Sequence, residues 1–302
     1  MRHGSQPHAE AVRAAARLSR GPTVRHKGTM ATEFRDRYGP CALVAGSAVG
    51  LGAEWARQLA AHGLDLVLLD RDGGTLDATA REIATAHGIT VAPVTIDVAR
   101  PDLVEALRPA LAARDIGLLV YNAALGTVAP FLDLDPDHIQ AMLAVNCAGP
   151  LLLARALVPA MVARGRGGVI FMSSLSGNVG SAQLAAYAAT KAFTLVAADA
   201  LWAELRPQGV DVLAVQPGST RTPGWLSSQP AEDEGMGLPV MQPADVVREA
   251  LAALGVEPVV VPGEMNRQGA AALAGLPRRQ AIELMSAVTG RLVPNYRPRR
   301  AE

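Results

Sequence analysis

Tyr187 and Lys191 stand four residues apart in an alanine-rich stretch that is expected to form a helix. Residues with this spacing lie on one face of a helix, one turn apart. An ammonium group beside a phenol favours the phenolate, so we expect Lys191 to lower the pKa of Tyr187 from its usual value of about 10. A phenol tuned in this way can act as a general acid or base at neutral pH. The pair therefore indicates proton transfer, although an amphipathic Tyr and a solvated Lys would give the same spacing.

Ser174 precedes Tyr187 by thirteen positions and follows a short apolar run, residues 169–172, that is expected to be a strand. A hydroxyl at the end of that strand can face the same point in space as the phenol. Ser173 is the neighbouring alternative. The spacing to Tyr187 and the glycine at 177, three residues after Ser174, favour Ser174, and we expect Ser173 to pack or to cap.

The composition describes a globular protein with a sizeable core. Half of the 302 residues are hydrophobic and 19% are charged, which fits one large α/β domain or two smaller ones. The formal net charge is zero, so there is no electrostatic basis for binding nucleic acid or an anionic membrane. No apolar run reaches transmembrane length, and the N-terminus lacks the apolar core of a signal peptide. Cys41 and Cys147 match no metal or disulfide spacing, so we expect two small buried hydrophobes, no metal site and a cytoplasmic protein.

Apolar runs alternate with helical patterns from residue 41 onward. Strands are expected at residues 41–46, 64–70, 91–98 and 116–124, with helices at 47–63, 75–88 and 101–115. Alternation of this kind predicts a parallel sheet covered by helices on both faces.

The first strand is followed by Gly46, Gly50 and Gly52. Glycines between a strand and a helix let the backbone approach a pyrophosphate at the helix N-terminus, where amide N–H groups favour negative charge. The alternative is a tight turn with close helix packing. A dinucleotide site at this turn would also include Ser47, Val49 and Leu51.

Asp70 ends the second strand, eighteen residues after Gly52. A carboxylate at this place accepts a hydrogen bond from a ribose 2′-hydroxyl and repels a 2′-phosphate. Arg71 could pair with that phosphate, but the glycine turn holds no basic residue to help it. We therefore predict NAD as the cofactor, with NADP as the alternative. Asp97 and Val98, after the third strand, are predicted to contact the adenine; a turn or N-cap role for Asp97 is the alternative.

Over about residues 39–262 the chain resembles the short-chain dehydrogenase/reductase family. The glycine motif of that family matches AGSAVGLG, with Ala45 where Thr is usual, and its Asn-Asn-Ala-Gly motif appears as residues 121–124, YNAA. The C-terminal tail, residues 264–292, and residues 34–39, FRDRYG, resemble the hydroxysteroid and fatty-acyl reductase branch of this family. The resemblance implies a single Rossmann-type, doubly wound parallel sheet of about seven strands, with helices on both faces.

The same resemblance implies the roles of individual residues. The catalytic residues of the family fall on Asn146, Ser174, Tyr187 and Lys191. Tyr187 would be the acid–base group, Ser174 would hydrogen-bond the substrate oxygen, and Lys191 would hold the nicotinamide ribose. Asn146 is either a structural hydrogen-bonding residue or the holder of a water that relays protons to Lys191. Besides Tyr187 and Lys191, the implied cofactor contacts after the fourth and sixth strands are Asn122, Ala123, Ala124, Pro217, Gly218, Thr220 and Thr222.

Residues 222–241 have no regular pattern and are rich in Gly, Pro and Ser, which is typical of a functional loop. We expect a substrate lid with Trp225, Met236 and Leu238 as its apolar wall. The predicted function is NAD(P)-dependent interconversion of a small apolar ketone and a secondary alcohol, although Arg221 leaves an acidic substrate open. Two alternatives are a non-catalytic dinucleotide-binding redox sensor and another reaction on the same fold.

The chain is expected to divide into three parts. Residues 1–38 are predicted to be a disordered extension, residues 39–263 the catalytic domain, and residues 264–302 a helical tail on or near the substrate side. The expected helix at 184–205 is apolar around most of its circumference. The family pairs this helix and the preceding one, residues 137–164, across a two-fold axis, which implies a homodimer or homotetramer. A helix buried within one subunit is the alternative.

Overall fold

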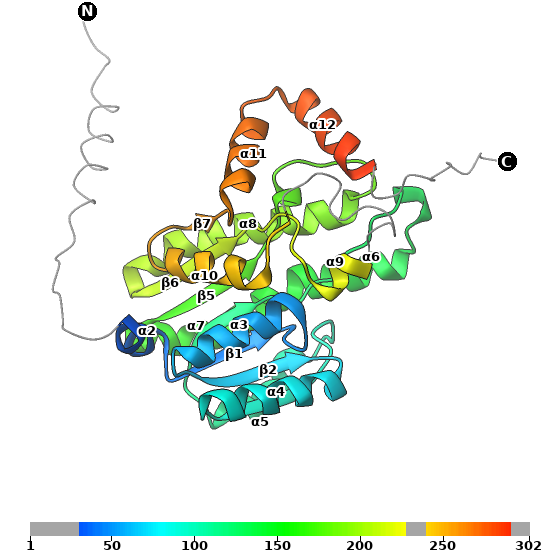
Figure 1. Ribbon diagram of the computed structural model, residues 1–302. Helices are drawn as coiled ribbons and strands as arrows, with labels where there is room; N and C mark the ends of the chain where they lie inside the picture. Colours follow the sequence, from blue (N-terminus) through cyan, green and yellow to red (C-terminus); the bar gives the residue numbers. More distant parts are fainter. Residues whose placement is uncertain (1–29, 228–239, 291–302) are drawn as a thin grey trace, which may run out of the picture.

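The computed structural model describes residues 30–227 and 240–290 of the chain. Seven strands form one parallel sheet in the order β3-β2-β1-β4-β5-β6-β7, with helices on both faces (Figure 1). The predicted Rossmann-type fold is thereby confirmed. The strands are β1 Cys41–Ala45, β2 Asp65–Asp70, β3 Val91–Thr95, β4 Ile116–Tyr121, β5 Gly167–Met172, β6 Val210–Val215 and β7 Val259–Val260.

Helices connect these strands and continue beyond the last one. They are α2 Met30–Tyr38, α3 Gly50–Ala61, α4 Gly73–His87, α5 Leu103–Ala112, α6 Pro136–Leu143, α7 Gly149–Arg164, α8 Ala185–Leu205, α9 Pro223–Ser227, α10 Pro243–Ala253, α11 Glu264–Ala274 and α12 Arg278–Gly290. The expected tail helix is thus two helices, since Gly275 and Pro277 interrupt it. The α11–α12 pair projects from the body of the molecule (Figure 1).

Two apolar layers hold the helices against the sheet. Successive strand residues point to opposite faces. In β1, Ala42 and Val44 pack in the layer under α3, α4 and α10, which contains Trp55. Leu43 and Ala45 pack in the layer under α5, α7 and α8. Burial on both faces explains why the strands read as continuous apolar runs.

The strand order reverses between β1 and β4. The chain runs outward from β1 to β3 and then returns to place β4 on the other side of β1. Loops at the carboxyl ends of two such strands leave in opposite directions and open a crevice for a ligand. Gly46 follows β1 and Asn122 follows β4, so both lie at this crevice.

Helix α2 lies within the segment that the sequence set apart as an extension. Arg37 makes two hydrogen bonds to Asp211 at the start of β6, of 2.6 and 2.7 Å. The Tyr38 hydroxyl donates to the same carboxylate at 2.6 Å. A buried carboxylate requires such partners, so α2 is fixed to the sheet. Residues 1–29 lie outside the described residues.

The helical run Pro136–Arg164 contains α6, a π-helical turn at Ala144–Ala148, and α7. It is the one helix in the described part of the chain that is long and apolar enough, by length and composition, to cross a membrane. Its side chains Met142, Leu153 and Met161 are buried in the protein. The core helix of a soluble protein meets the same criterion.

Candidate active site

Three of the four predicted catalytic side chains meet where β5 ends and α8 begins. Ser174 lies two residues beyond β5, and Tyr187 and Lys191 lie on the first two turns of α8. The Lys191 ammonium nitrogen is 5.6 Å from the centre of the Tyr187 ring. The Ser174 hydroxyl lies close enough to the phenol of Tyr187 to act on its pKa, which it lowers. The structure therefore brings together the proton-transfer residues that the sequence spacing predicts.

Lys191 is buried, with 4% of its surface exposed. Its Nζ donates a hydrogen bond to the Met172 carbonyl at the end of β5, at 2.8 Å. Burial disfavours the charged form and lowers the pKa of Lys191 to about 8. The ammonium is therefore held on the strand and titrates close to neutral pH.

The predicted fall in the pKa of Tyr187 is wrong for this arrangement. Although part of the residue stays exposed, desolvation of the phenol raises its pKa, and the Ser174 hydroxyl opposes that rise without cancelling it. Lys191 directs a hydrogen bond to Met172 and lies over the ring. Sequence spacing placed both groups on one helix face but could not show where the ammonium points.

Asn146 is a structural hydrogen-bonding residue. Its side-chain Nδ2 donates to the Leu125 carbonyl at 2.8 Å and to Thr190 Oγ1 at 2.9 Å, while Oδ1 accepts from the Leu125 N–H at 2.8 Å. Thr190 in turn donates to the Tyr187 carbonyl at 2.8 Å. The π-helical turn thus connects the loop after β4 to helix α8. The proton-relay role of Asn146 stays a prediction.

Ser173 and Ser174 have different surroundings, as the sequence predicts. Ser173 is buried, and its hydroxyl donates to the Lys191 carbonyl at 2.8 Å, which confirms a packing role. Ser174 Oγ accepts from the Ser176 N–H at 3.2 Å and remains on the Tyr187 side. A Cβ on Gly177 would lie 2.8 Å from the Lys191 carbonyl carbon, so this loop can approach α8 only with glycine there.

Sequence reasoning missed the residues that position Tyr187 from behind. Thr190 links Asn146 to the Tyr187 backbone. The backbone at Gly126 lies against the phenol ring, because a Cβ there would be 3.1 Å from Cε2 of Tyr187. Thr190 could have been found as the hydroxyl three residues after Tyr187 on the same helix face. The contact of Gly126 has no sequence signal, since it depends on how the loop after β4 meets helix α8.

The β1–α3 turn is pressed against the end of β4. Gly46 has a φ of 77°, and a Cβ on it would lie 2.6 Å from the Ala123 Cα. Asn122 Nδ2 donates to the Gly46 carbonyl at 2.7 Å. A Cβ on Gly52 would lie 1.8 Å from the Gly46 carbonyl oxygen. Gly46 and Gly52 therefore stand where the backbone of the turn contacts other backbone atoms, as the close packing of a dinucleotide-binding turn requires.

The N-terminus of α3 offers N–H groups to an anion. Within the described residues, no side chain caps this helix at Val49, and its first turn holds no acidic residue. Free N–H groups and the helix dipole favour negative charge at such a position. The Ser47 side chain is buried and donates to the Leu69 carbonyl at 3.2 Å, so it supports the turn. The turn fits a pyrophosphate.

Asp70 contacts the glycine turn directly. Its Oδ2 accepts from the Ala48 N–H at 2.9 Å, and its Oδ1 accepts from the Asp72 N–H at 3.2 Å. Arg71 is exposed. Asp97 is exposed and accepts from the Ala99 N–H at 2.9 Å, the geometry of the turn residue that was the alternative for this position.

The segment after β6 joins the Ser174 loop to the glycine turn. The Pro217 carbonyl accepts from the Leu175 N–H at 3.2 Å, and a Cβ on Gly50 would lie 3.1 Å from the Thr222 Cβ. Thr222 Oγ1 also accepts from the Trp225 N–H at 3.2 Å, at the start of the short helix α9. Two of the predicted substrate-wall residues, Met236 and Leu238, lie outside the described residues.

A family model described as short chain dehydrogenase matches residues 40–233. Two similar proteins are 7beta-hydroxysteroid dehydrogenases. That of Clostridium sardiniense is 30% identical over 235 residues, covering 78% of this chain and 90% of the relative. That of Collinsella aerofaciens is 31% identical over 236 residues, with 78% and 90% covered.

Solved structures of dehydrogenases also superpose on this chain. A structure of a study on 7beta-hydroxysteroid dehydrogenase stereoselectivity superposes with a TM-score of 0.79 at 29% identity, covering 83% of this chain and 98% of that one. A short-chain dehydrogenase from Sphingobium yanoikuyae in complex with NADPH superposes with a TM-score of 0.68 at 29% identity, covering 87% of this chain and 99% of that one. The bulky-bulky ketone specific alcohol dehydrogenase from Comamonas testosteroni superposes with a TM-score of 0.66 at 26% identity, covering 88% of this chain and 98% of that one. Other neighbours hold NADP or NADH.

Proposed function

The chain belongs to the short-chain dehydrogenase/reductase family, and from this premise we propose that it interconverts an apolar ketone and its secondary alcohol. The observation that carries the proposal is the meeting of Ser174, Tyr187 and Lys191 at the end of β5, beside a turn that fits a dinucleotide. A bound NAD(P) would supply the hydride in reduction and accept it in oxidation.

Tyr187 donates its proton to the substrate oxygen during reduction and recovers it during oxidation. Ser174 hydrogen-bonds the same oxygen, and a donor of this kind typically contributes about 10²–10³ in rate. Lys191 holds the nicotinamide ribose. Thr190 and Asn146 fix the backbone of α8 behind the phenol.

We propose a substrate with an apolar body. The relatives are named for hydroxysteroids and a solved neighbour for bulky ketones, which supports this class. Of the three residues proposed as the apolar wall of the substrate site, the structure describes Trp225. It is partly buried in α9, next to the cofactor segment.

We propose NAD over NADP as the cofactor, and Asp70 supports this choice. Its carboxylate is fixed at the glycine turn by two backbone N–H groups, where a ribose 2′-phosphate would meet its negative charge. Arg71 is the competing residue.

A fluorescence titration with NADH and with NADPH tests the cofactor proposal. We expect NADH to bind more tightly to the wild-type protein. Asp70→Asn keeps the size of the side chain and one acceptor oxygen but removes the charge, so it should move the preference toward NADPH. Arg71→Ala is the control and should leave NADH binding unchanged. Tighter binding of NADPH to the wild type would contradict the proposed preference, and binding of neither dinucleotide would contradict the enzyme proposal.

We further propose that the protein is a homodimer or homotetramer. Apolar side chains remain exposed on neighbouring helices: Leu151 and Leu152 on α7 are 36% and 41% exposed, and Phe193 and Val196 on α8 are 42% and 65% exposed. Small side chains elsewhere on α8 would let a second copy approach closely. Burial of this surface would stabilise a dimer.

A further inference from the structure

Helix α12 contacts the loop that leads from Ser174 to Tyr187. Ser286 Oγ accepts from the Ala182 N–H at 3.0 Å, and the hydroxyls of Thr289 and Ser181 are 3.1 Å apart. Arg278 Nη1 donates to the Asn178 carbonyl at 3.3 Å. Three points along α12 therefore hold residues 178–182, although the contacting residues are 100 to 108 positions apart in the chain.

The central contact of this group is a buried pair of hydroxyls. Thr289 is 2% exposed and Ser181 is 8% exposed. Thr289 Oγ1 is also 2.9 Å from the Met285 carbonyl oxygen, which fixes the hydroxyl on its own helix. A buried hydroxyl that loses its partner costs about 1–3 kcal/mol, so removal of one member weakens the attachment of the loop.

The held loop ends in a strained residue. Gln183 has a φ of 67°, and it is the one non-glycine residue with positive φ in ranges 30–227 and 240–290. Such a conformation costs about 1–3 kcal/mol and persists where surrounding contacts enforce it. The Gln183 carbonyl accepts from the Ala129 N–H at 2.9 Å on one side, and α12 holds Ala182 on the other. Helix α8 begins two residues later, and Tyr187 lies on its first turn.

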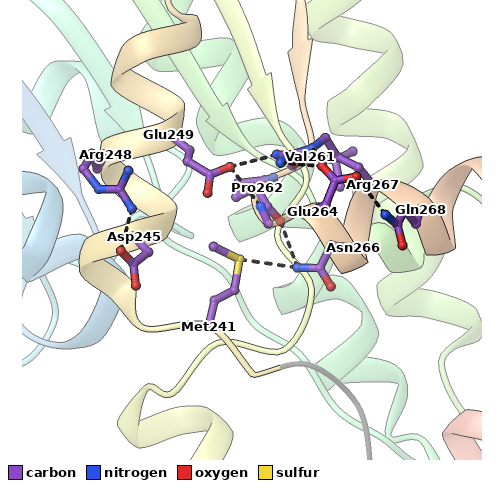
Figure 2. A network of polar contacts seen from close by, with 11 residues as sticks. Met241, Asp245, Arg248, Glu249, Val261, Pro262, Glu264, Asn266, Arg267 and Gln268 are labelled. Carbon is purple, nitrogen blue, oxygen red and sulfur yellow. Dashed lines mark hydrogen bonds and ion pairs between the residues drawn. The ribbon is translucent and has the colours of Figure 1, made fainter.

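The other end of the α11–α12 pair is fixed beside the cofactor segment. Glu249 of α10 accepts from Arg267 (Figure 2) and from the Gly263 N–H, each at 2.9 Å. Asn266 is buried and donates to the Pro262 carbonyl at 2.8 Å. Its Oδ1 is 2.6 Å from the position that a Cβ on Gly218 would take. Helix α11 is therefore anchored at its start, and α12 extends from it to the Tyr187 loop.

We propose that Ser286 and Thr289 are positioning residues for Tyr187. They act through the Ser181–Gln183 turn, whose strained backbone sets where α8 starts and how well the phenol is shielded from water. The inference rests on the proposed function, in which Tyr187 transfers the proton.

Four single variants of α12 separate positioning from stability. Thr289→Val keeps the shape and removes the hydroxyl, Thr289→Ser restores it, and Ser286→Ala removes the second contact. Glu283→Ala is the control, because Glu283 is an exposed residue of the same helix that pairs with Arg279 at the surface. Each variant is compared in the oxidation of a 7β-hydroxysteroid with NAD and with NADP. A tyrosinate absorbance titration, taken as the difference from the matching Tyr187→Phe protein, gives the pKa of Tyr187.

We expect Thr289→Val and Ser286→Ala to lower kcat by about tenfold or more with unchanged dinucleotide affinity, as a misplaced catalytic group does. The pKa of Tyr187 should fall toward its ordinary value, because the loosened loop admits water. Thr289→Ser and Glu283→Ala should match the wild type in both measurements.

An unchanged pKa of Tyr187 in Thr289→Val would overturn the proposal, and so would equal losses in Thr289→Val and Thr289→Ser. A wild-type protein that oxidises no probe would count against the proposed function alone, since the absorbance titration needs no turnover.

Discussion

The phenol of Tyr187 and the ammonium of Lys191 illustrate how burial acts in opposite directions on an acid and a base. Desolvation raises the pKa of Tyr187 and lowers that of Lys191 to about 8, because each group is favoured in its neutral form. The two pKa values, which ordinarily lie close together, therefore move apart, with that of Lys191 now the lower. Between about pH 8 and the ordinary pKa of tyrosine, both groups are therefore neutral in the folded protein.

Tyr187→Phe tests the proton-transfer role. We expect ketone reduction to fall by about 10² or more, since a positioned general acid contributes about 10²–10⁴. Dinucleotide affinity should be nearly unchanged. Tyr121→Phe is the matched control: it removes a hydroxyl that donates to the Val145 carbonyl at 2.6 Å and should lower stability while turnover remains. A Tyr187→Phe protein with most of its rate would show that another group is the acid.

The pKa of Lys191 predicts how stability depends on pH. The residue is neutral above about pH 8 in the folded protein, against its ordinary value of 10.5, so between these values the unfolded state binds more protons. Lys191 therefore makes the unfolding free energy rise with pH across this window, and the wild type should gain up to about 3 kcal/mol over Lys191→Met. Urea denaturation of both proteins from pH 7 to 11 measures the difference. A difference that stays flat would show that the pKa is not lowered.

At the scale of elements, the β1–α3 turn depends on the absence of side chains. Gly52 of α3 lies over the Gly46 carbonyl, and Gly46 lies against Ala123 after β4. Backbone atoms cannot move aside as flexible side chains can, so this contact fixes the position of α3 relative to the sheet. The helix N-terminus is thereby aimed at the crevice between β1 and β4.

Gly52→Ala and Gly74→Ala make a matched pair for this element. Alanine is about 1 kcal/mol better than glycine within a helix, so propensity alone favours both changes. A Cβ at 52 would lie 1.8 Å from the Gly46 carbonyl oxygen, whereas at 74, in α4, its nearest neighbour is 3.8 Å away. We expect Gly52→Ala to lose dinucleotide binding and melting temperature, and Gly74→Ala to keep both. Equal NADH affinity in the two variants would contradict the role of the turn.

At the scale of the whole molecule, α7 and α8 have one face on the sheet and another exposed. Leu153, Leu157 and Met161 of α7 pack in the core, whereas Leu152 on the same helix and Val196 on α8 are exposed. The sequence alternative of an α8 buried wholly within one subunit does not match this exposure. The exposed face is what a second copy would cover.

Val196→Glu tests the proposed assembly. A charge placed in an apolar interface without a partner should dissociate the oligomer, because burying it costs more than the contact gains. Val256→Glu is the control, since Val256 is 70% exposed just after α10 and lies outside the α7–α8 face. Light scattering of both variants gives their masses. A monomeric wild type would contradict the proposal.

The sequence by itself determined the strand–helix alternation, the parallel sheet, the glycine turn and the order of Ser174, Tyr187 and Lys191. These features depend on local periodicity and on spacing within one helix or turn, and such patterns are written in neighbouring residues. Because crossovers are right-handed, helices on both faces of one open sheet require the winding direction to reverse, as it does between β1 and β4.

Only the tertiary structure decided what surrounds those residues. The Lys191 ammonium bonds to Met172 and leaves the pKa of Tyr187 raised, Asn146 ties Leu125 to Thr190, and α12 holds the loop before Tyr187. Each of these contacts joins segments that are distant along the chain, so no local pattern encodes it. Burial has the same origin, because a side chain loses water only when remote elements cover it.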